Sequence, residues 1–197
     1  MSFRKEKKFR LSISDSLMIK SKLINDGMLE LHPRRIISSQ YFDTRELRMF
    51  KESEEGIVPR KKFRIRWYNN DKSNLTYEEK TSSIEGRFKI AKKINMNDFS
   101  HSLIYGFFNK EYGSIKPSLL VEYEREYYEY NSVRITFDQN ISYRHNLDNF
   151  LCRDSERVVE IKAPFNAPED FLEKIISTPP SRFSKYSRGF LIKYKEL

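Results

Sequence analysis

The sequence has few of the residues that mark several common classes of protein. Cys152 is its only cysteine, so an intramolecular disulfide and a cysteine-based zinc site are both excluded. Only six glycines are present, and neither glycine-rich phosphate loop, Gly-x-x-x-x-Gly-Lys or Gly-x-Gly-x-x-Gly, occurs. The histidines, His32, His101 and His145, lack the spacing of metal ligands, so we expect them at the surface. We expect Cys152 to be a buried residue without a catalytic role.

Long apolar segments are also missing. No stretch approaches the roughly 18 apolar residues that a membrane-spanning helix needs. The basic segment of residues 1–10 is not followed by the apolar core of a signal peptide. We therefore expect a soluble cytoplasmic protein, with which a single cysteine is compatible. The length of 197 residues suits one domain that spans residues 1–197.

What the sequence does have is an excess of positive charge. Its 37 Lys and Arg residues against 28 Asp and Glu residues give a formal net charge of +9. Such a charge attracts nucleic acid, phosphorylated metabolites or anionic lipid surfaces, and it does not distinguish among them. Aromatic residues make up 14% of the chain, which is enough to build a hydrophobic core from relatively few positions.

The most informative segment is residues 60–68, Arg-Lys-Lys-Phe-Arg-Ile-Arg-Trp-Tyr. If this segment is a β-strand, alternate residues share a face, and one face is almost wholly basic while the other is mostly apolar. The basic face holds Arg60, Lys62, Arg64 and Arg66. A weaker form of the pattern returns in other segments. A sheet of such strands either exposes a basic face to solvent or closes around a basic interior, and the second arrangement suits a polyanion.

The order of predicted elements indicates an α+β protein built on an antiparallel sheet or barrel. Strands are expected over residues 3–11, 35–42, 60–68, 75–80, 87–94, 119–130, 133–138 and 157–163. Helices are expected over about 14–25, 47–51, 96–111 and 169–176, and the tail over 183–194 could be helix or strand. Turns or loops are expected at 53–59, 69–74, 131–132 and 144–154.

A few carboxylates share the predicted basic faces: Glu6, Glu78, Asp138 and Glu160. Mixed signs with cations in excess suit a site for phosphates and a divalent metal, because such a metal takes one or two carboxylates together with substrate phosphates. Basic charge with interleaved aromatic residues is also typical of RNA-binding modules. Carboxylates on the same faces argue against that reading, because they repel a nucleic-acid backbone.

The ordered set of short motifs resembles the polyphosphate polymerase domain of the vacuolar transporter chaperone (VTC) family, which belongs to the triphosphate tunnel metalloenzymes. The motifs are Arg4-x-Glu6-x-Lys8-Phe9, Tyr41-Phe42-Asp43-Thr44, Arg64-x-Arg66, Glu78-x-Lys80, Tyr123-x-Arg125, Arg134-x-Thr136-x-Asp138, Val159-Glu160-Ile161-Lys162 and Ser184-Lys185. Each motif is weak alone, whereas the ordered set is specific for the fold and less specific for the reaction. The resemblance implies an antiparallel β-barrel with a few flanking helices, which forms a tunnel for a nucleoside triphosphate or inorganic polyphosphate.

The resemblance also implies roles for individual residues. Catalysis is expected from Arg64, Arg66, Lys80, Arg125, Glu160 and Lys185. Contacts with substrate phosphates are expected from Lys8, Lys62, Arg64, Arg66, Lys80, Lys89, Tyr123, Arg125, Arg134, Lys162, Ser184 and Lys185. A divalent cation, Mn²⁺ or Mg²⁺, is expected on Glu160, with Glu6 as the next ligand.

The family resemblance gives a first expectation for the reaction and leaves two alternatives. VTC-type members transfer the terminal phosphate of ATP to a growing polyphosphate chain, so we expect a metal-dependent polyphosphate polymerase. Other tunnel enzymes hydrolyse triphosphates, and some cyclise ATP, so a triphosphatase stays open, as does a non-catalytic module that binds polyphosphate or RNA. Arg4 stands where many tunnel enzymes have a Glu, which weakens the triphosphatase. The membrane helices of fungal polymerases are not among these residues, so a membrane-protein partner is an open expectation, whereas nucleic acid is not an expected partner.

Overall fold

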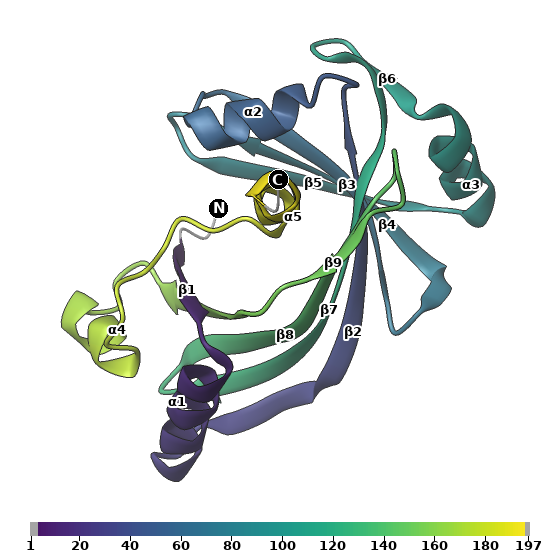
Figure 1. The fold of residues 1–197 in the computed structure, drawn as a ribbon. Helices are drawn as coiled ribbons and strands as arrows, with labels where there is room; N and C mark the ends of the chain where they lie inside the picture. The colour runs from purple at the N-terminus through teal and green to yellow at the C-terminus, as the bar shows by residue number, and fades with distance from the viewer. Residues whose placement is uncertain (1–3, 196–197) are drawn as a thin grey trace. The chain divides into compact units, whose positions relative to one another are not determined.

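The computed structural model describes residues 4–195 (Figure 1). These residues form two compact units. Within the described residues, the first unit draws on residues 4–35, 123–141 and 153–183, and the second draws on residues 36–122, 142–152 and 184–195. Three long strands contribute residues to both units: β2 (Leu29–Asp43), β7 (Gly113–Tyr130) and β8 (Val133–His145). A single domain over residues 1–197 stays a prediction.

The first unit is an antiparallel sheet with the strand order β1 (Arg4–Leu11), β10 (Arg157–Pro164), β8, β7 and β2. Helix α1 (Ile13–Asn25) follows β1 and begins after Ser12, whose side-chain oxygen accepts a hydrogen bond from the backbone N–H of Asp15 at 3.0 Å. Helix α4 (Glu169–Ile175) follows β10. The short strand β9 (Leu151–Arg153) pairs with β8.

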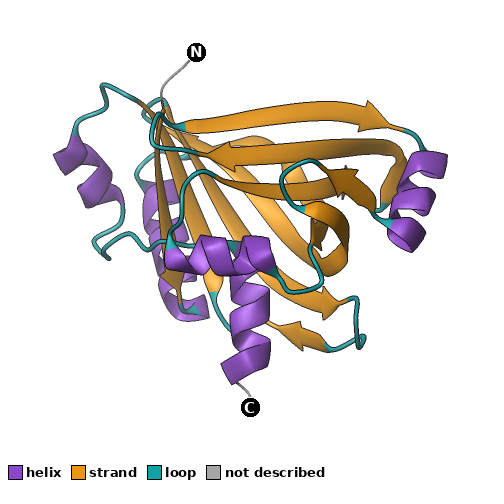
Figure 2. Cartoon of the chain, turned by 90° about the horizontal axis from the view of Figure 1, so that it is seen from above, coloured by secondary structure: helices purple, strands orange, loops and turns teal. Residues whose placement is uncertain are grey.

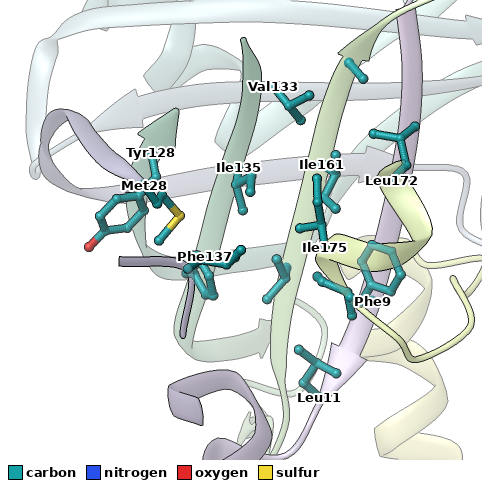
Figure 3. Packing of buried hydrophobic residues seen from close by; sticks show 14 residues of the cluster. Phe9, Leu11, Met28, Tyr128, Val133, Ile135, Phe137, Ile161, Leu172 and Ile175 are labelled. Atoms are coloured by element: carbon teal, nitrogen blue, oxygen red, sulfur yellow. The ribbon is translucent and has the colours of Figure 1, made fainter. Parts of the chain in front are cut away.

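Alternate residues of β8 and β10 build the hydrophobic core of the first unit (Figure 3). The cluster includes Val133, Ile135, Phe137 and Ile161 from these strands, together with Phe9 of β1 and Leu172 and Ile175 of α4. Since the side chains of a strand alternate between its faces, the even-numbered positions of β8 and β10 point to the other face. Those positions hold polar and charged residues, among them Thr136, Asp138 and Glu160.

The second unit has the strand order β7, β2, β3 (Arg60–Tyr68), β4 (Asp71–Ser82) and β5 (Arg87–Ile94). Its helices are α2 (Arg48–Glu55), α3 (Met96–Tyr105) and α5 (Lys185–Lys195), and the short β6 (Phe107–Asn109) pairs with β7. Figure 2 shows the helices, strands and loops of the chain from a second direction. Phe63, Ile65 and Trp67 of β3 pack into a core with residues such as Phe42 and Phe99. The basic positions of β3 therefore lie on the opposite face, as the alternation predicted.

The predicted α+β class with an antiparallel sheet is confirmed. Most predicted elements are present with shifted ends, and the tail, which could have been helix or strand, is the helix α5. Phe3, the first residue of the first predicted strand, lies outside the described residues. No helix in residues 4–195 is long and apolar enough to cross a membrane.

Several predicted boundaries are wrong for local physical reasons. The turn expected over 69–74 is only Asn69-Asn70, because both asparagines adopt positive φ angles, 52° and 60°, which suit a two-residue hairpin turn. Asn131-Ser132, with φ angles of 48° and 62°, forms the corresponding turn between β7 and β8. The helix expected over 96–111 stops at Tyr105, since Gly106 follows with a φ angle of 72°.

Other corrections concern the secondary structure of two segments and the burial of two residues. Helix α2 extends into the loop expected over 53–59, and the turn-like segment 144–154 contains β9. His145 is buried rather than at the surface, and its Nε2 lies 3.1 Å from the carbonyl oxygen of Gly189. Cys152 is half-buried rather than buried.

Candidate phosphate and metal sites

The basic face of the second unit contains a row of three lysines. Lys62 of β3 lies opposite Lys80 of β4, and Lys80 lies opposite Lys89 of β5. Directly opposed side chains on one face of a sheet have Cβ atoms about 5 Å apart, and like charges at that separation destabilise the sheet. This row of Lys62, Lys80 and Lys89, hereafter the lysine row, is stabilised when anionic groups lie beside it. The arrangement suits the closely spaced charges of a phosphate chain.

Beside the lysine row, a carboxylate and a phenol hold Arg64 in place. Arg64 is buried, its Nε donates to Oε2 of Glu78 at 2.5 Å, and its Nη1 donates to the hydroxyl of Tyr41 at 3.0 Å. The ammonium group of Lys89 lies 2.5 Å from the other oxygen of Glu78. Glu78 thus fixes two of the predicted phosphate-binding cations. Arg66, the next cation on β3, donates from Nε to the hydroxyl oxygen of Ser39 at 2.9 Å.

The positive potential of this face lowers the pKa values of Glu78 and Tyr41. Burial alone would raise the pKa of Glu78, but the nearby charges of Arg64 and Arg66 outweigh it and lower the pKa to about 2. Burial would likewise raise the pKa of Tyr41, whereas Arg64, Arg66 and Lys62 lower it to about 8. The same potential favours the binding of phosphate groups.

The pairing of Glu78 should make stability fall with acidification in a defined window. Because the pKa of Glu78 in the folded protein, about 2, lies below the ordinary 4.5, the pair stabilises the fold fully above pH 4.5. That contribution is lost as the pH falls toward 2. Urea unfolding across this window should therefore show a steeper acid loss for the wild-type protein than for Glu78→Gln. Parallel curves for the two proteins would contradict the pairing.

Ser184, which precedes α5, and Tyr186 in the first turn of α5 support the same face of the second unit. Lys62 donates from Nζ to the side-chain oxygen of Ser184 at 2.9 Å and lies 5.7 Å from the ring centre of Tyr186. The ring of Tyr186 stacks on Tyr41 at 4.9 Å, and its hydroxyl donates to the buried carboxylate of Asp43. Burial raises the pKa of Asp43 above its ordinary range, and burial beside Asp43 raises that of Tyr186. The chain thus uses α5 to position Lys62 and Tyr41.

The first unit contains a separate cluster of ion pairs centred on Glu160, which is 7% exposed. Oε1 of Glu160 lies 2.9 Å from the ammonium group of Lys162, and Oε2 lies 3.6 Å from Nη2 of Arg125. Arg125 also donates to both carboxylate oxygens of Asp138, at 2.5 and 2.7 Å. Asp138 is fully buried, so this two-point pair fixes the guanidinium group of Arg125 beside Glu160.

Glu6 and Lys8 of β1 extend the cluster, because each lies opposite a residue of opposite charge on β10. Lys8 lies opposite Glu160, Glu6 lies opposite Lys162, and Lys8 and Glu6 contact each other at 2.9 Å. Burial opposes ionisation of both glutamates, but neighbouring cations hold the pKa of Glu160 and of Glu6 below the ordinary value. The charge of Glu160 partly offsets this effect at Glu6. Both carboxylates are therefore ionised at neutral pH.

Two ionised carboxylates on neighbouring strands fit a hard divalent cation. Within residues 4–195, no group of three His, Cys, Asp or Glu side chains could hold a metal ion. A cation on Glu160 and Glu6 would therefore complete its shell with phosphate and water oxygens, which is how Mg²⁺ is usually bound in phosphate-transferring sites. The donor set thus fits the predicted cofactor, provided that Lys8 and Lys162 give up their carboxylate partners when the cation binds.

The structure divides the predicted site residues between the units, and a few of them lie at the margins of the clusters. Tyr123 is buried, with the guanidinium group of Arg125 5.3 Å from its ring centre. Arg134 is exposed and lies opposite Lys162. The first unit holds Glu6, Lys8, Tyr123, Arg125, Arg134, Glu160 and Lys162. The second unit holds Lys62, Arg64, Arg66, Lys80, Lys89, Ser184 and Lys185, with Lys185 at the start of α5.

Several residues that shape these clusters were not among the predicted catalytic, phosphate-binding or metal-binding residues. Glu78 and Asp138 were placed on basic faces by the two-residue period, and that pattern was the signal that could have identified them as partners of arginines. Tyr41 and Asp43 belong to one of the motifs, yet the motif does not show which groups they contact. Tyr186 carried no signal, because its partner Asp43 lies 143 positions away.

The family comparison identifies the chain. The VTC domain family matches residues 3–104 and 100–194, which together cover nearly the whole sequence, so the chain belongs to the VTC domain family. No curated protein matches the sequence. The match confirms the resemblance to the VTC family that the ordered motifs predicted.

Solved structures share the fold at low sequence identity. A proposed adenylate cyclase from Bacillus halodurans is 13% identical, with a TM-score of 0.64 over 96% of this chain and 98% of that one. A proposed adenylyl cyclase from Hippeastrum, reported to have a dominant triphosphatase activity, is 14% identical, with a TM-score of 0.60 over 95% of each chain. A conserved protein from Pyrococcus furiosus is 16% identical, with a TM-score of 0.54 over 93% of this chain and 99% of that one. These likenesses support the predicted tunnel-type fold.

Proposed function

We propose that the protein is a metal-dependent polyphosphate polymerase, which transfers the terminal phosphate of ATP to a polyphosphate chain. The observation that carries the proposal is the lysine row of the second unit, flanked by Arg64 and Arg66. A row of cations across three strands matches a linear polyanion better than a single phosphate group. Membership of the VTC domain family supports the same substrate class.

The chemistry demands positioning more than covalent catalysis. In phosphoryl transfer, the protein mainly aligns the attacking and leaving oxygens and stabilises negative charge on the group in transit. Arg64 and Arg66 offer planar forks of donors that suit phosphate oxygens. Arg64 is already oriented by Glu78 and Tyr41, so it would engage a phosphate with little loss of side-chain freedom.

The carboxylate cluster of the first unit supplies the metal site in this proposal. Glu160 and Glu6 would hold Mn²⁺ or Mg²⁺, and the bound cation would stabilise developing charge on phosphate oxygens. Lys8 and Lys162 now contact these carboxylates, and their ammonium groups would turn to phosphate oxygens when the cation takes their place. Arg125 stays beside Glu160 because Asp138 holds it at two points.

Hydrolysis of triphosphates is the second candidate, with water in place of the phosphate chain as the acceptor. The triphosphatase activity of the Hippeastrum protein, which has the same fold, favours it. The same cations and carboxylates would serve both reactions. The product therefore distinguishes the two functions: long polyphosphate from the polymerase, and free phosphate from the hydrolase.

Incubation with ATP and Mn²⁺, followed by gel electrophoresis with a stain for polyphosphate, tests the proposal. The wild-type protein should give a ladder of polyphosphate. Arg66→Ala should reduce the yield about 100-fold or more, the usual effect of removing a donor that stabilises transition-state charge. Its melting temperature should be unchanged or raised, because the substitution relieves repulsion among like charges.

Lys61→Gln is the matched control, because Lys61 lies on the other face of the same strand and pairs with Glu79 and Glu111. It should keep full activity. Free phosphate without a ladder would favour the triphosphatase, and no turnover at all would favour a non-catalytic polyphosphate-binding module. A large drop in the melting temperature of Arg66→Ala would instead make Arg66 a structural residue.

A further inference from the structure

Thr136 has a buried hydroxyl group for which the fold supplies no hydrogen-bond partner. The residue is 4% exposed, and its Oγ1 makes no hydrogen bond with the described residues. A buried polar group without a partner destabilises a fold. The presence of such a group in a native structure therefore needs an explanation other than stability, and the binding of a ligand is one explanation.

The position of Thr136 in the sheet directs this hydroxyl toward the carboxylate cluster of the first unit. Thr136 lies directly opposite Glu160 in the pairing of β8 with β10. Its neighbours Ile135 and Phe137 point into the hydrophobic core, so Thr136 shares the opposite face with Asp138 and Glu160. Directly opposed side chains have Cβ atoms about 5 Å apart. A ligand bound to the carboxylate of Glu160 would therefore lie close to the hydroxyl group of Thr136.

We propose that Thr136 belongs to the cation site, where its hydroxyl hydrogen-bonds to water on a hydrated divalent cation held by Glu160. This inference rests on the metal dependence in the proposed function. A hydrated cation fits better than a phosphate group, because the group directly opposite Thr136 is the carboxylate of Glu160, which would repel phosphate. A hydroxyl can accept from one water and donate to another.

The site needs such a contribution because its carboxylates are few. Glu160 and Glu6 are the two carboxylates available, since Asp138 is engaged at both oxygens by Arg125. A cation held by two carboxylates keeps several waters, and those waters need partners of their own. Residues that hydrogen-bond to metal-bound ligands commonly change metal affinity 10–100-fold when they are replaced.

Titration of the whole protein with Mn²⁺, with free Mn²⁺ followed by electron paramagnetic resonance, tests the inference. It should be done with Mn²⁺ alone and with Mn²⁺ plus tripolyphosphate. Thr136→Val, which keeps the shape of the side chain and removes the hydroxyl, should weaken Mn²⁺ binding about tenfold. Thr136→Ser should bind like the wild-type protein, and Glu160→Gln should lose most of the binding.

Thermal unfolding without metal provides the second readout. Thr136→Val should be as stable as the wild-type protein or more stable, since it removes an unpartnered buried polar group. Lower stability of this variant would show that the hydroxyl serves the fold, and that result would overturn the inference. Wild-type Mn²⁺ affinity in Thr136→Val would overturn it too, as would an absence of Mn²⁺ binding by the wild-type protein.

These results are independent of the polymerase assay. A protein that binds Mn²⁺ through Glu160 and Thr136 but makes no polyphosphate supports the cation site and contradicts only the proposed reaction. A polymerase in which Thr136→Val keeps the wild-type affinity for Mn²⁺ supports the reaction and contradicts the role of Thr136.

Discussion

Replacement of Glu160 by glutamine should abolish Mn²⁺-dependent turnover of ATP while the protein stays folded. Glu160 is the most buried carboxylate among the proposed metal ligands, and neighbouring cations keep it ionised. A bound metal is worth several kcal/mol of charge stabilisation, so its loss should cost about 100-fold or more in rate. Release of phosphate and formation of polyphosphate, each measured with purified wild-type and variant proteins, would check this expectation.

Glutamine fits the site of Glu160 without disrupting the fold, because Arg125 keeps its two hydrogen bonds to Asp138. Glu169→Gln is the matched control. Glu169 is also ion-paired in the first unit, with Lys5 and Lys7, but it lies on α4 and outside the Glu160 cluster. It should keep wild-type turnover. If Glu160→Gln retained half of the wild-type rate, the assignment of Glu160 as the main metal ligand would be wrong.

The largest loss of stability should come from Asp138→Asn. This change leaves the charge of Arg125 next to a neutral amide in a nearly dry environment, because Asp138 is 0% exposed. Removal of one partner of a buried ion pair usually destabilises a protein by about 3–5 kcal/mol. The contact of Arg125 with Glu160 at 3.6 Å should keep the loss near the lower end of that range. Urea unfolding at neutral pH measures it directly.

Two further variants separate charge from packing at this pair. Glu156→Gln breaks the partly exposed pair with Arg10 and should change stability by no more than about 1 kcal/mol. The double variant Arg125→Met, Asp138→Leu removes both charges, so it should recover much of the stability lost in Asp138→Asn. It should nevertheless be inactive, since Arg125 is a proposed phosphate ligand. A stability of Asp138→Asn equal to that of the wild-type protein would refute the buried pair.

The strands and their polar faces could be predicted because the signal is local. In β3 the alternation of basic and apolar residues identifies both the strand and the side that faces the core, and Phe63, Ile65 and Trp67 are buried as that pattern predicted. The ends of elements were less predictable. Nothing near Glu111 shows that α3 stops at Tyr105, because the stop depends on Gly106, and one glycine is weak information in a helical pattern.

In the candidate sites, too, contacts between residues near in sequence could be predicted, whereas contacts between distant residues could not. The two-residue period placed Glu160 on the same face as Lys162, and the structure brings them to 2.9 Å. It could not show that both carboxylate oxygens of Asp138 would accept hydrogen bonds from Arg125, since that depends on how β7 and β8 pair. It could also not join Tyr186 to Asp43, because such contacts are set by tertiary packing rather than by sequence pattern.

The turn at Asn131-Ser132 limits the insertions and deletions that the sequence can accept during evolution. Both residues have positive φ angles, so the turn fixes how β7 and β8 pair. An insertion or deletion of one residue there would shift β8 by one position relative to β7 and reverse its two faces. Thr136 and Asp138 would then enter the hydrophobic core, and Ile135 and Phe137 would replace them in the ionic cluster. The length of this hairpin is therefore under stronger constraint than the identity of any residue in its turn.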